Sequence, residues 1–289
     1  MSRVIIQLII NGLLAGGIYA LVSIGLCLIF GVVEVINFAH GEFLMLGMYT
    51  TYWLFYFFKI DPYLSLLIVI PLSFLIGVIT QRVLIQPLLD APPLNQIFVT
   101  MGLSILLQNV ALILWKATYR TIKTTYSSWF IKSGGLSISF PRLLACIVAS
   151  GITVALLIFL KKTYVGKAIR AIAQDKRGAT LMGINVHRMY QLTFGLGTVC
   201  VGIAGAILMP IYYAFPTVGL LFCLTAFAVV IVGGYNSLTG AFIAGFVIGL
   251  IESFSGFFIS PHLQQGVYFA IVILVLLFKP SGLLGLKES

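Results

Sequence analysis

The sequence predicts an all-α integral membrane protein, a single polytopic helical bundle that occupies residues 1–289. Hydrophobic residues make up 61% of the chain, charged residues only 8%, and the mean hydropathy is +1.13. No water-soluble fold could bury so much apolar surface. Long segments of alternating polarity, which would indicate a membrane barrel, are missing from the sequence, so helices are expected to form the spans.

The net charge of +10 has a simple explanation in a helical membrane protein. Basic residues gather on the cytoplasmic side, where they contact anionic lipid headgroups or acidic partner surfaces. We therefore expect contacts with membrane lipid and no nucleic-acid binding. Cys27, Cys146, Cys200 and Cys223 all lie in apolar runs without a C-x-x-C motif, so neither a disulfide nor a metal site is expected.

Hydropathy windows of about 19 residues predict eight or nine transmembrane segments. The candidate spans are 4–32, 43–58, 63–80, 94–115, 143–160, 189–214, 218–235, 240–259 and 263–278. The first is too long for one upright crossing at about 1.5 Å per residue, and too long for a cleavable signal peptide. The second is short, so the uncertain boundary is 34–42, where a broken helix is possible.

Two polar segments interrupt the spans. Residues 116–142 are rich in Thr, Ser and aromatic residues around Gly134-Gly135, which predicts a short hairpin in an external loop. Residues 161–188 contain seven basic residues and one acidic residue, against five basic residues in 116–142. Because one span separates the two segments, only one can be cytoplasmic, and the larger positive excess favours 161–188. Lys279 and Lys287 then fall inside as well.

An amphipathic helix is predicted within residues 161–188, bracketed by Gly166 and Gly178. Apolar side chains recur at helical spacing, and charged or polar side chains take the opposite face. The apolar positions are Val165, Ala168, Ile169, Ile172 and Ala173, and the polar positions are Lys167, Arg170, Gln174 and Arg177. We expect this apolar stripe to need a partner outside the chain.

Glycine is patterned within the spans. Gly12-x-x-x-Gly16 and Gly245-x-x-x-Gly249 are typical of close helix packing, although a hinge role is also open. A faint internal echo, N-x-x-x-G-x-F, begins at Asn37 and again at Asn236. Duplicated halves are common in transporters, but three identities can equally arise by chance.

The unusual polar cluster contains Asn37, His40, Gly41 and Glu42, just after Glu34. Ionisable groups at bilayer depth are costly and normally line a protected path. A helix break here would let the freed backbone groups face a cavity, and we expect the cluster to lie close to the solute path. The alternative is a polar cytoplasmic loop between the first two spans.

Three more polar residues are candidates for the substrate path. Glu252 lies near the end of an apolar run, where it either snorkels or has a buried role. Gln108 and Asn109 fall in the middle of the fourth span, and adjacent amides cannot share one helix face. At least one of them is expected to bond a neighbouring helix.

Catalytic motifs are missing from the sequence. It has no G-x-x-x-x-G-K-[ST] loop for ATP, no H-E-x-x-H and no G-x-S-x-G. We therefore expect no enzymatic activity and no cofactor in this chain.

Several segments together resemble the LivH-type permeases of branched-chain amino-acid ABC importers, nearly end to end. They are V-I-N-F-A-H-G-E at 35–42, Gln108-Asn109, G-K-A-x-R-A at 166–171, L-M-G-I-N at 181–185 and K-P-S-G-L-L-G at 279–285. The resemblance implies a bacterial-type inner-membrane permease. It also implies a LivM-like second permease, two cytoplasmic ATPases that hold ATP and Mg²⁺, and an external solute-binding protein.

The resemblance further implies that residues 161–188 are a cytoplasmic coupling loop that fits a cleft on an ATPase. The candidate coupling residues are Lys167, Ile169, Arg170, Ile172, Asp175 and Gly183. The chain departs from the general permease motif, since no Glu precedes Ala171 and Ala173. The family also handles other amino acids, amides and urea. An ABC permease for urea or short amides is thus one alternative, and an ion-coupled secondary transporter is another.

Overall fold

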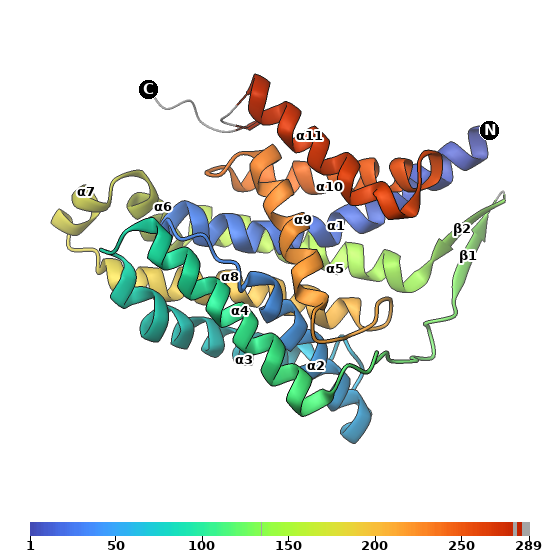
Figure 1. Ribbon diagram of the computed structural model, residues 1–289, viewed down its shortest axis with the longest axis horizontal. Coiled ribbons are helices and arrows are strands. Elements are labelled where there is room, and N and C mark those ends of the chain that lie inside the picture. Colours follow the sequence, from blue (N-terminus) through green and yellow to red (C-terminus); the bar gives the residue numbers. More distant parts are fainter. Residues whose placement is uncertain (134, 280–281, 285–289) are drawn as a thin grey trace.

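The computed structural model describes residues 1–133, 135–279 and 282–284, and each of the nine candidate spans forms a helix there (Figure 1). These helices are α1 (Ser2–Val33), α2 (His40–Phe58), α3 (Leu66–Thr80), α4 (Pro93–Trp115), α5 (Phe140–Lys162), α8 (Val186–Leu208), α9 (Val218–Gly233), α10 (Leu238–Phe258) and α11 (Gln264–Phe278). Within the described residues, seven helical segments are long and apolar enough to cross a membrane, and α9 is a shorter apolar helix. The all-α membrane bundle is therefore confirmed.

The third span is longer than its apolar run suggests. Helix α3 continues without a turn through a π-helical segment, Gln81–Ile85, and a 3-10 segment, Gln86–Leu88. The helix therefore continues through Gln86-Pro87, because a 3-10 turn accepts proline in its first positions.

The two predicted glycine motifs pack against each other, joining α1 to α10. A Cβ on Gly12 would lie 2.8 Å from the Cα of Leu250, and one on Gly16 would lie 2.6 Å from the Cα of Phe246. Side chains larger than hydrogen would therefore force the two backbones apart. The close-packing interpretation is confirmed for these glycines.

The first two spans are separated by a break in the helix. Helix α1 ends at Val33, where Glu34 adopts a left-handed conformation with φ 59°. Residues 35–37 have no regular structure, and α2 begins at His40. The ring nitrogen Nε2 of His40 lies 3.0 Å from the carbonyl oxygen of Val22, more than two turns back along α1. The chain thus folds back into the bundle before α2 begins.

Residues 161–188 form two helices, α6 (Tyr164–Gln174) and α7 (Lys176–Leu181). The Thr163 hydroxyl accepts a hydrogen bond from the Gly166 amide, and the Asp175 carboxylate accepts one from the Arg177 amide. The predicted boundaries at Gly166 and Gly178 are wrong, because these side chains cap the helices earlier and each glycine lies inside a helix.

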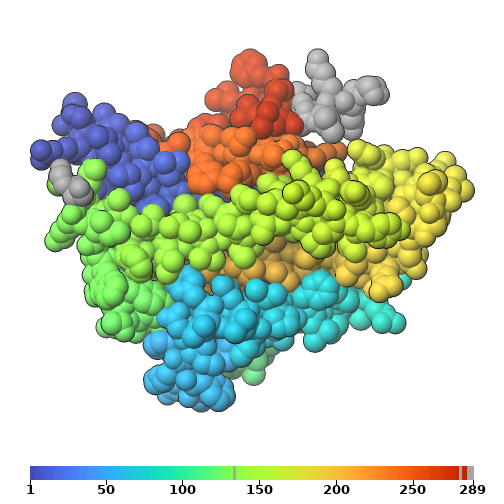
Figure 2. All heavy atoms as spheres, turned by 180° about the vertical axis from the view of Figure 1, so that it is seen from behind, coloured from blue at the N-terminus to red at the C-terminus, as the bar shows by residue number. Residues whose placement is uncertain are grey.

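The other polar segment contains the predicted hairpin, with β1 (Phe130–Ser133) paired antiparallel to β2 (Leu136–Ser139). It packs beside the start of α1, where the Gln7 side chain donates to the Ser137 carbonyl and accepts from the Ser137 amide. The hairpin and the N-terminus lie together at one end of the molecule, and α6 and α7 lie at the opposite end (Figures 1 and 2). Gly134, Pro280, Ser281, Gly285 and Lys287 lie outside the described residues.

A cysteine-labelling experiment can test the predicted topology. Lys132 in the hairpin and Lys176 in α7 are both exposed, at opposite ends of the molecule. In a background without the four native cysteines, we expect an impermeant thiol reagent to label Lys132→Cys in intact cells. Lys176→Cys should react only after the membrane is opened. Labelling of Lys176→Cys from outside would invert the topology.

Candidate functional site

The polar cluster at the start of α2 is buried in the middle of the bundle. Asn37, His40 and Glu42 are fully buried. Glu42 bonds to α4 at Ser104 and Gln108, which lie halfway along that helix. The surface-loop alternative is therefore excluded for these three side chains, and the broken helix is confirmed.

Glu42 ties three helices together. Its Oε1 accepts hydrogen bonds from the Ser104 hydroxyl at 3.1 Å and the Gln108 amide at 2.8 Å. Its other oxygen, Oε2, lies 2.8 Å from the place a Cβ would take on Gly219, in the first turn of α9. Glu42 is also in the first turn of α2. The carboxyl group of Glu42 therefore lies against the N-terminal ends of both α2 and α9.

The starts of α2 and α9 meet at two glycines. A Cβ on Gly41 would overlap the Gly219 backbone carbonyl, and a Cβ on Gly219 would overlap the Gly41 carbonyl. The Cys223 thiol, one turn further along α9, contacts the carbonyl oxygen of Phe38 at 3.4 Å. Gly41, the second residue of α2, is therefore a packing position, and the helix is interrupted before it, at 34–39.

Several polar atoms of this cluster have no hydrogen-bond partner among the described residues. They are the Asn37 Nδ2, the His40 Nδ1 and the Glu42 Oε2. Buried groups of this kind normally find a partner, because leaving them unpaired costs about 1–3 kcal/mol each. The unpaired polar atoms of the cluster can therefore form hydrogen bonds to a further polar group.

The two amides of α4 have different surroundings. Gln108 bonds Glu42 on α2, as expected for at least one of the pair. The side chain of Asn109 donates to the Ile105 carbonyl of its own helix, on an exposed face. The structure therefore joins Gln108 to the buried cluster and leaves Asn109 outside it.

The apolar stripe of α6 is covered by this chain itself at three of its five positions, which therefore need no external partner, while Val165 is half-buried and Ala173 is exposed. Ala168, Ile169 and Ile172 are buried, and α6 packs against α1, α5 and α8. Amphipathic spacing shows that a face is buried but does not identify what covers it.

One side chain on the polar face of α6 also forms a hydrogen bond within the chain. Arg170 donates from Nε to the Leu160 carbonyl at 3.0 Å, at the C-terminal end of α5. Lys167 and Asp175 remain exposed, and Gly183 has φ 81° with open space around it. Among the coupling candidates, Lys167, Arg170, Asp175 and Gly183 thus lie on the surface, and Ile169 and Ile172 are buried.

The surface at this end also contains apolar side chains that are not among the predicted coupling residues. Tyr164, Leu181 and Met182 have exposed fractions of 81%, 88% and 83%. Leu181 and Met182 lie where α7 ends, so they break the helical period and no stripe reveals them. Exposed apolar side chains grouped on a water-facing loop are typical of a protein-binding surface.

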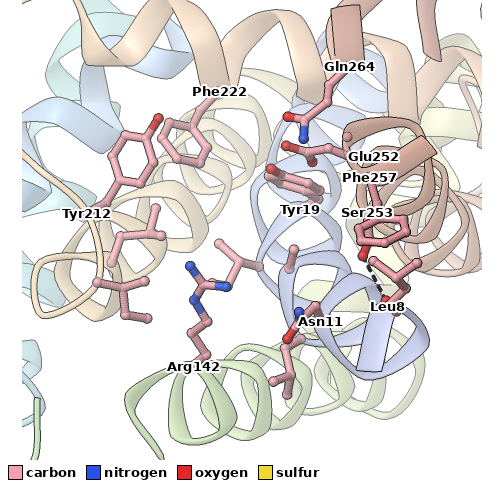
Figure 3. A pocket seen from close by; sticks show the side chains of 17 residues that line it. Leu8, Asn11, Tyr19, Arg142, Tyr212, Phe222, Glu252, Ser253, Phe257 and Gln264 are labelled. Carbon is pink, nitrogen blue, oxygen red and sulfur yellow. Dashed lines mark hydrogen bonds between the residues drawn. The ribbon is translucent and has the colours of Figure 1, made fainter. Parts of the chain in front are cut away.

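Glu252 lies inside a cavity of about 450 Å³ between α1, α10 and the segment that joins α8 to α9 (Figure 3). It lines the wall with Tyr19 and Gln264, well within the length of α10. Glu252 is half-buried there, and whether it snorkels or has a buried role stays a prediction. None of the cluster at Asn37–Glu42 lines this cavity.

No metal centre is formed in the described part of the chain, where no three His, Cys, Asp or Glu side chains come close enough to share an ion.

Comparison with known proteins identifies the family. The model of the family described as branched-chain amino acid transport system / permease component matches residues 8–276. The permease protein BraD of the high-affinity branched-chain amino acid transport system of Pseudomonas aeruginosa is 31% identical, over 98% of this chain and 96% of its own length. LivH of the corresponding Salmonella typhimurium system is 30% identical over the same shares.

A more distant relative is the probable branched-chain amino acid transport permease protein LivH of Methanocaldococcus jannaschii, 27% identical over 96% of this chain and 92% of its own. No solved structure matches the chain. The spans and the full-length similarity together make it a multi-pass inner-membrane protein, a non-catalytic subunit of an ABC transport system. The chain belongs to the family of permease components of branched-chain amino acid transport systems.

Proposed function

We propose that this chain is a permease subunit of an ATP-driven importer of branched-chain amino acids. The observation that supports this most is similarity over 98% of the chain to permeases named for that transport. In this proposal the chain pairs with a second, LivM-like permease and with two cytoplasmic ATPases that bind ATP and Mg²⁺. An external solute-binding protein delivers the amino acid to the hairpin end.

Uptake by a strain lacking this chain tests the proposal. We expect deletion to lower uptake of radiolabelled leucine, isoleucine and valine, and the restored gene to recover it. Excess unlabelled urea or acetamide should leave leucine uptake unchanged. Inhibition by urea or acetamide at low concentration would favour the amide alternative, and uptake that follows a proton or sodium gradient without ATP would favour a secondary transporter.

The exposed apolar group at Leu181 and Met182 is the proposed contact with an ATPase. We expect Leu181→Asp to abolish transport and the stimulation of ATP hydrolysis, while the permease still inserts at a normal level. An aspartate there would bury a charge in the interface, which is costly without a partner. Normal uptake by Leu181→Asp would rule out this contact.

Ile169→Asp is the matched comparison, because Ile169 is buried within the chain itself. We expect this variant to lose folded protein in the membrane rather than coupling alone, since it places a carboxylate in the core. Measuring the membrane level of both variants beside uptake separates the two effects.

A further inference from the structure

The cavity beside Glu252 has two charged side chains of opposite sign in its lining, Arg142 and Glu252. Arg142 reaches in from the start of α5, while Glu252 projects from α10 on another side, next to Tyr19 and Gln264 (Figure 3). Its volume of about 450 Å³ falls within the roughly 300–1,000 Å³ range of small-molecule sites.

The rest of the wall is mostly aliphatic and aromatic. Leu14, Ile18, Phe222 and Phe257 face the same space as the two charges. The Oε2 atom of Glu252 is buried and has no hydrogen-bond partner among the described residues. An ionised carboxylate in such surroundings needs a cation or a hydrogen-bond donor as a partner. Tyr19 lies next to Glu252, and the guanidinium of Arg142 lies on another side of the cavity.

A second, more polar cavity of about 370 Å³ adjoins the first and shares Asn11, Arg142 and Ile211 with it. It is lined by the hydroxyl-bearing residues Ser127, Ser137 and Ser139 of the hairpin segment. The two cavities therefore lie side by side, and together they are called the recess here. The cavity at the hairpin is the more polar of the two, and Glu252 lines only the other.

We propose that this recess receives a zwitterionic amino acid with an aliphatic side chain, its carboxylate facing Arg142 and its ammonium facing Glu252. This assignment rests on the proposed function and adds a place for the substrate within this chain. The guanidinium binds a carboxylate through paired hydrogen bonds, and the apolar wall covers the aliphatic side chain. A molecule that lacks either charge leaves one of the two side chains without a counter-ion, which is the basis of the selectivity.

Protection of single cysteines tests the site without requiring transport. The full chain, in its membrane with its native partners, has Cys27, Cys146, Cys200 and Cys223 replaced by alanine. Ile211→Cys places a thiol where the two cavities join, and Ser253→Cys is a second reporter inside the first cavity. Tyr213→Cys is the matched control, because Tyr213 is exposed nearby but lines neither cavity.

We expect L-leucine to slow the reaction of Ile211→Cys and Ser253→Cys with an impermeant thiol reagent. At about ten times the dissociation constant the slowing is about tenfold by mass action. The control at 213 should react at the same rate with and without leucine. 4-Methylvalerate, which lacks the ammonium, and isoamylamine, which lacks the carboxylate, should not protect at equal concentration.

Two charge-removing variants complete the test. Arg142→Gln and Glu252→Gln should each abolish protection by leucine while the unprotected labelling rate stays the same, which a merely structural role would not produce. If neither reporter is protected in a chain that takes up leucine, the site is wrong and the proposed function stands. If deletion of the chain leaves leucine uptake intact, the proposed function fails whatever the labelling shows. Equal protection by leucine, 4-methylvalerate and isoamylamine would indicate a nonselective apolar recess and would also overturn the assignment.

Discussion

Gly41→Ala is expected to lower the free energy of unfolding by about 3 kcal/mol, at the upper end of the usual cost of overpacking a core. The added methyl group would overlap the Gly219 backbone carbonyl, which belongs to the first turn of α9 and cannot rotate away as a flexible side chain can. Either α2 and α9 separate, or the Glu42 contacts are lost. Thermal unfolding of the purified protein in detergent measures the change.

Gly102→Ala is the matched control for this substitution. Gly102 lies in α4, and a Cβ there would meet nothing within 4 Å. Alanine is a better helix former than glycine, so this variant should be more stable than wild type by up to about 1 kcal/mol. Equal unfolding temperatures for the two variants would show that the close contact between α2 and α9 does not limit stability.

Glu42→Ala is expected to lower transport by about tenfold or more at equal expression, a loss equivalent to about 1.4 kcal/mol in a rate. The substitution removes the acceptor of the Ser104 hydroxyl and the Gln108 amide. It also removes the carboxyl group from between the first turns of α2 and α9. Initial rates of leucine uptake, normalised to the amount of permease in the membrane, measure the effect.

Glu42→Gln separates charge from shape at the same position. Its amide oxygen can still accept from Gln108, so the fold should persist, but its amide hydrogens would face the start of α9, which itself presents donors. We expect an intermediate loss of uptake with little loss of stability. Asn109→Ala is the control, since Asn109 bonds only within its own helix and should transport normally.

Near-normal uptake by variants of this cluster would exclude a role for it in transport. If Glu42→Gln and His40→Ala both keep uptake within about a factor of two, under ~0.5 kcal/mol in rate terms, the cluster at Asn37–Glu42 joins two helices and takes no part in gating. The role in the solute path would then be wrong, although the break itself stands in the structure.

Much of the fold follows from hydropathy alone, because a membrane leaves few ways to satisfy the backbone. All nine apolar runs are helices, and the glycines at 12, 16, 245 and 249 do pack together. Hydropathy did not detect the continuation from Thr80 to Leu88, since a helix in a membrane can carry polar residues where it reaches the surface.

The candidate functional sites were harder to predict from the sequence than the fold. The cluster at 34–42 stood out because ionisable residues are rare at that depth, yet nothing in the spacing indicates that Glu42 bonds to α4. The periodicity of α6 shows that one face of the helix is buried, but it does not show which element covers that face. The sequence therefore predicts an outside partner where the structure has other helices of the same chain. The recess at Glu252 is lined by residues that lie far apart in the sequence. Only the folded structure therefore shows that Arg142 and Glu252 line one cavity.

The internal burial of α6 has a mechanical consequence. Ile169 and Ile172 lock α6 to the bundle, and Arg170 ties it to the last carbonyls of α5. In the proposed function, a push at Leu181 and Met182, where α7 ends, would pass through α6 to α5, which runs as one helix from this end to Arg142 at the recess. Helix α5 would then connect the proposed ATPase contact to the cavity.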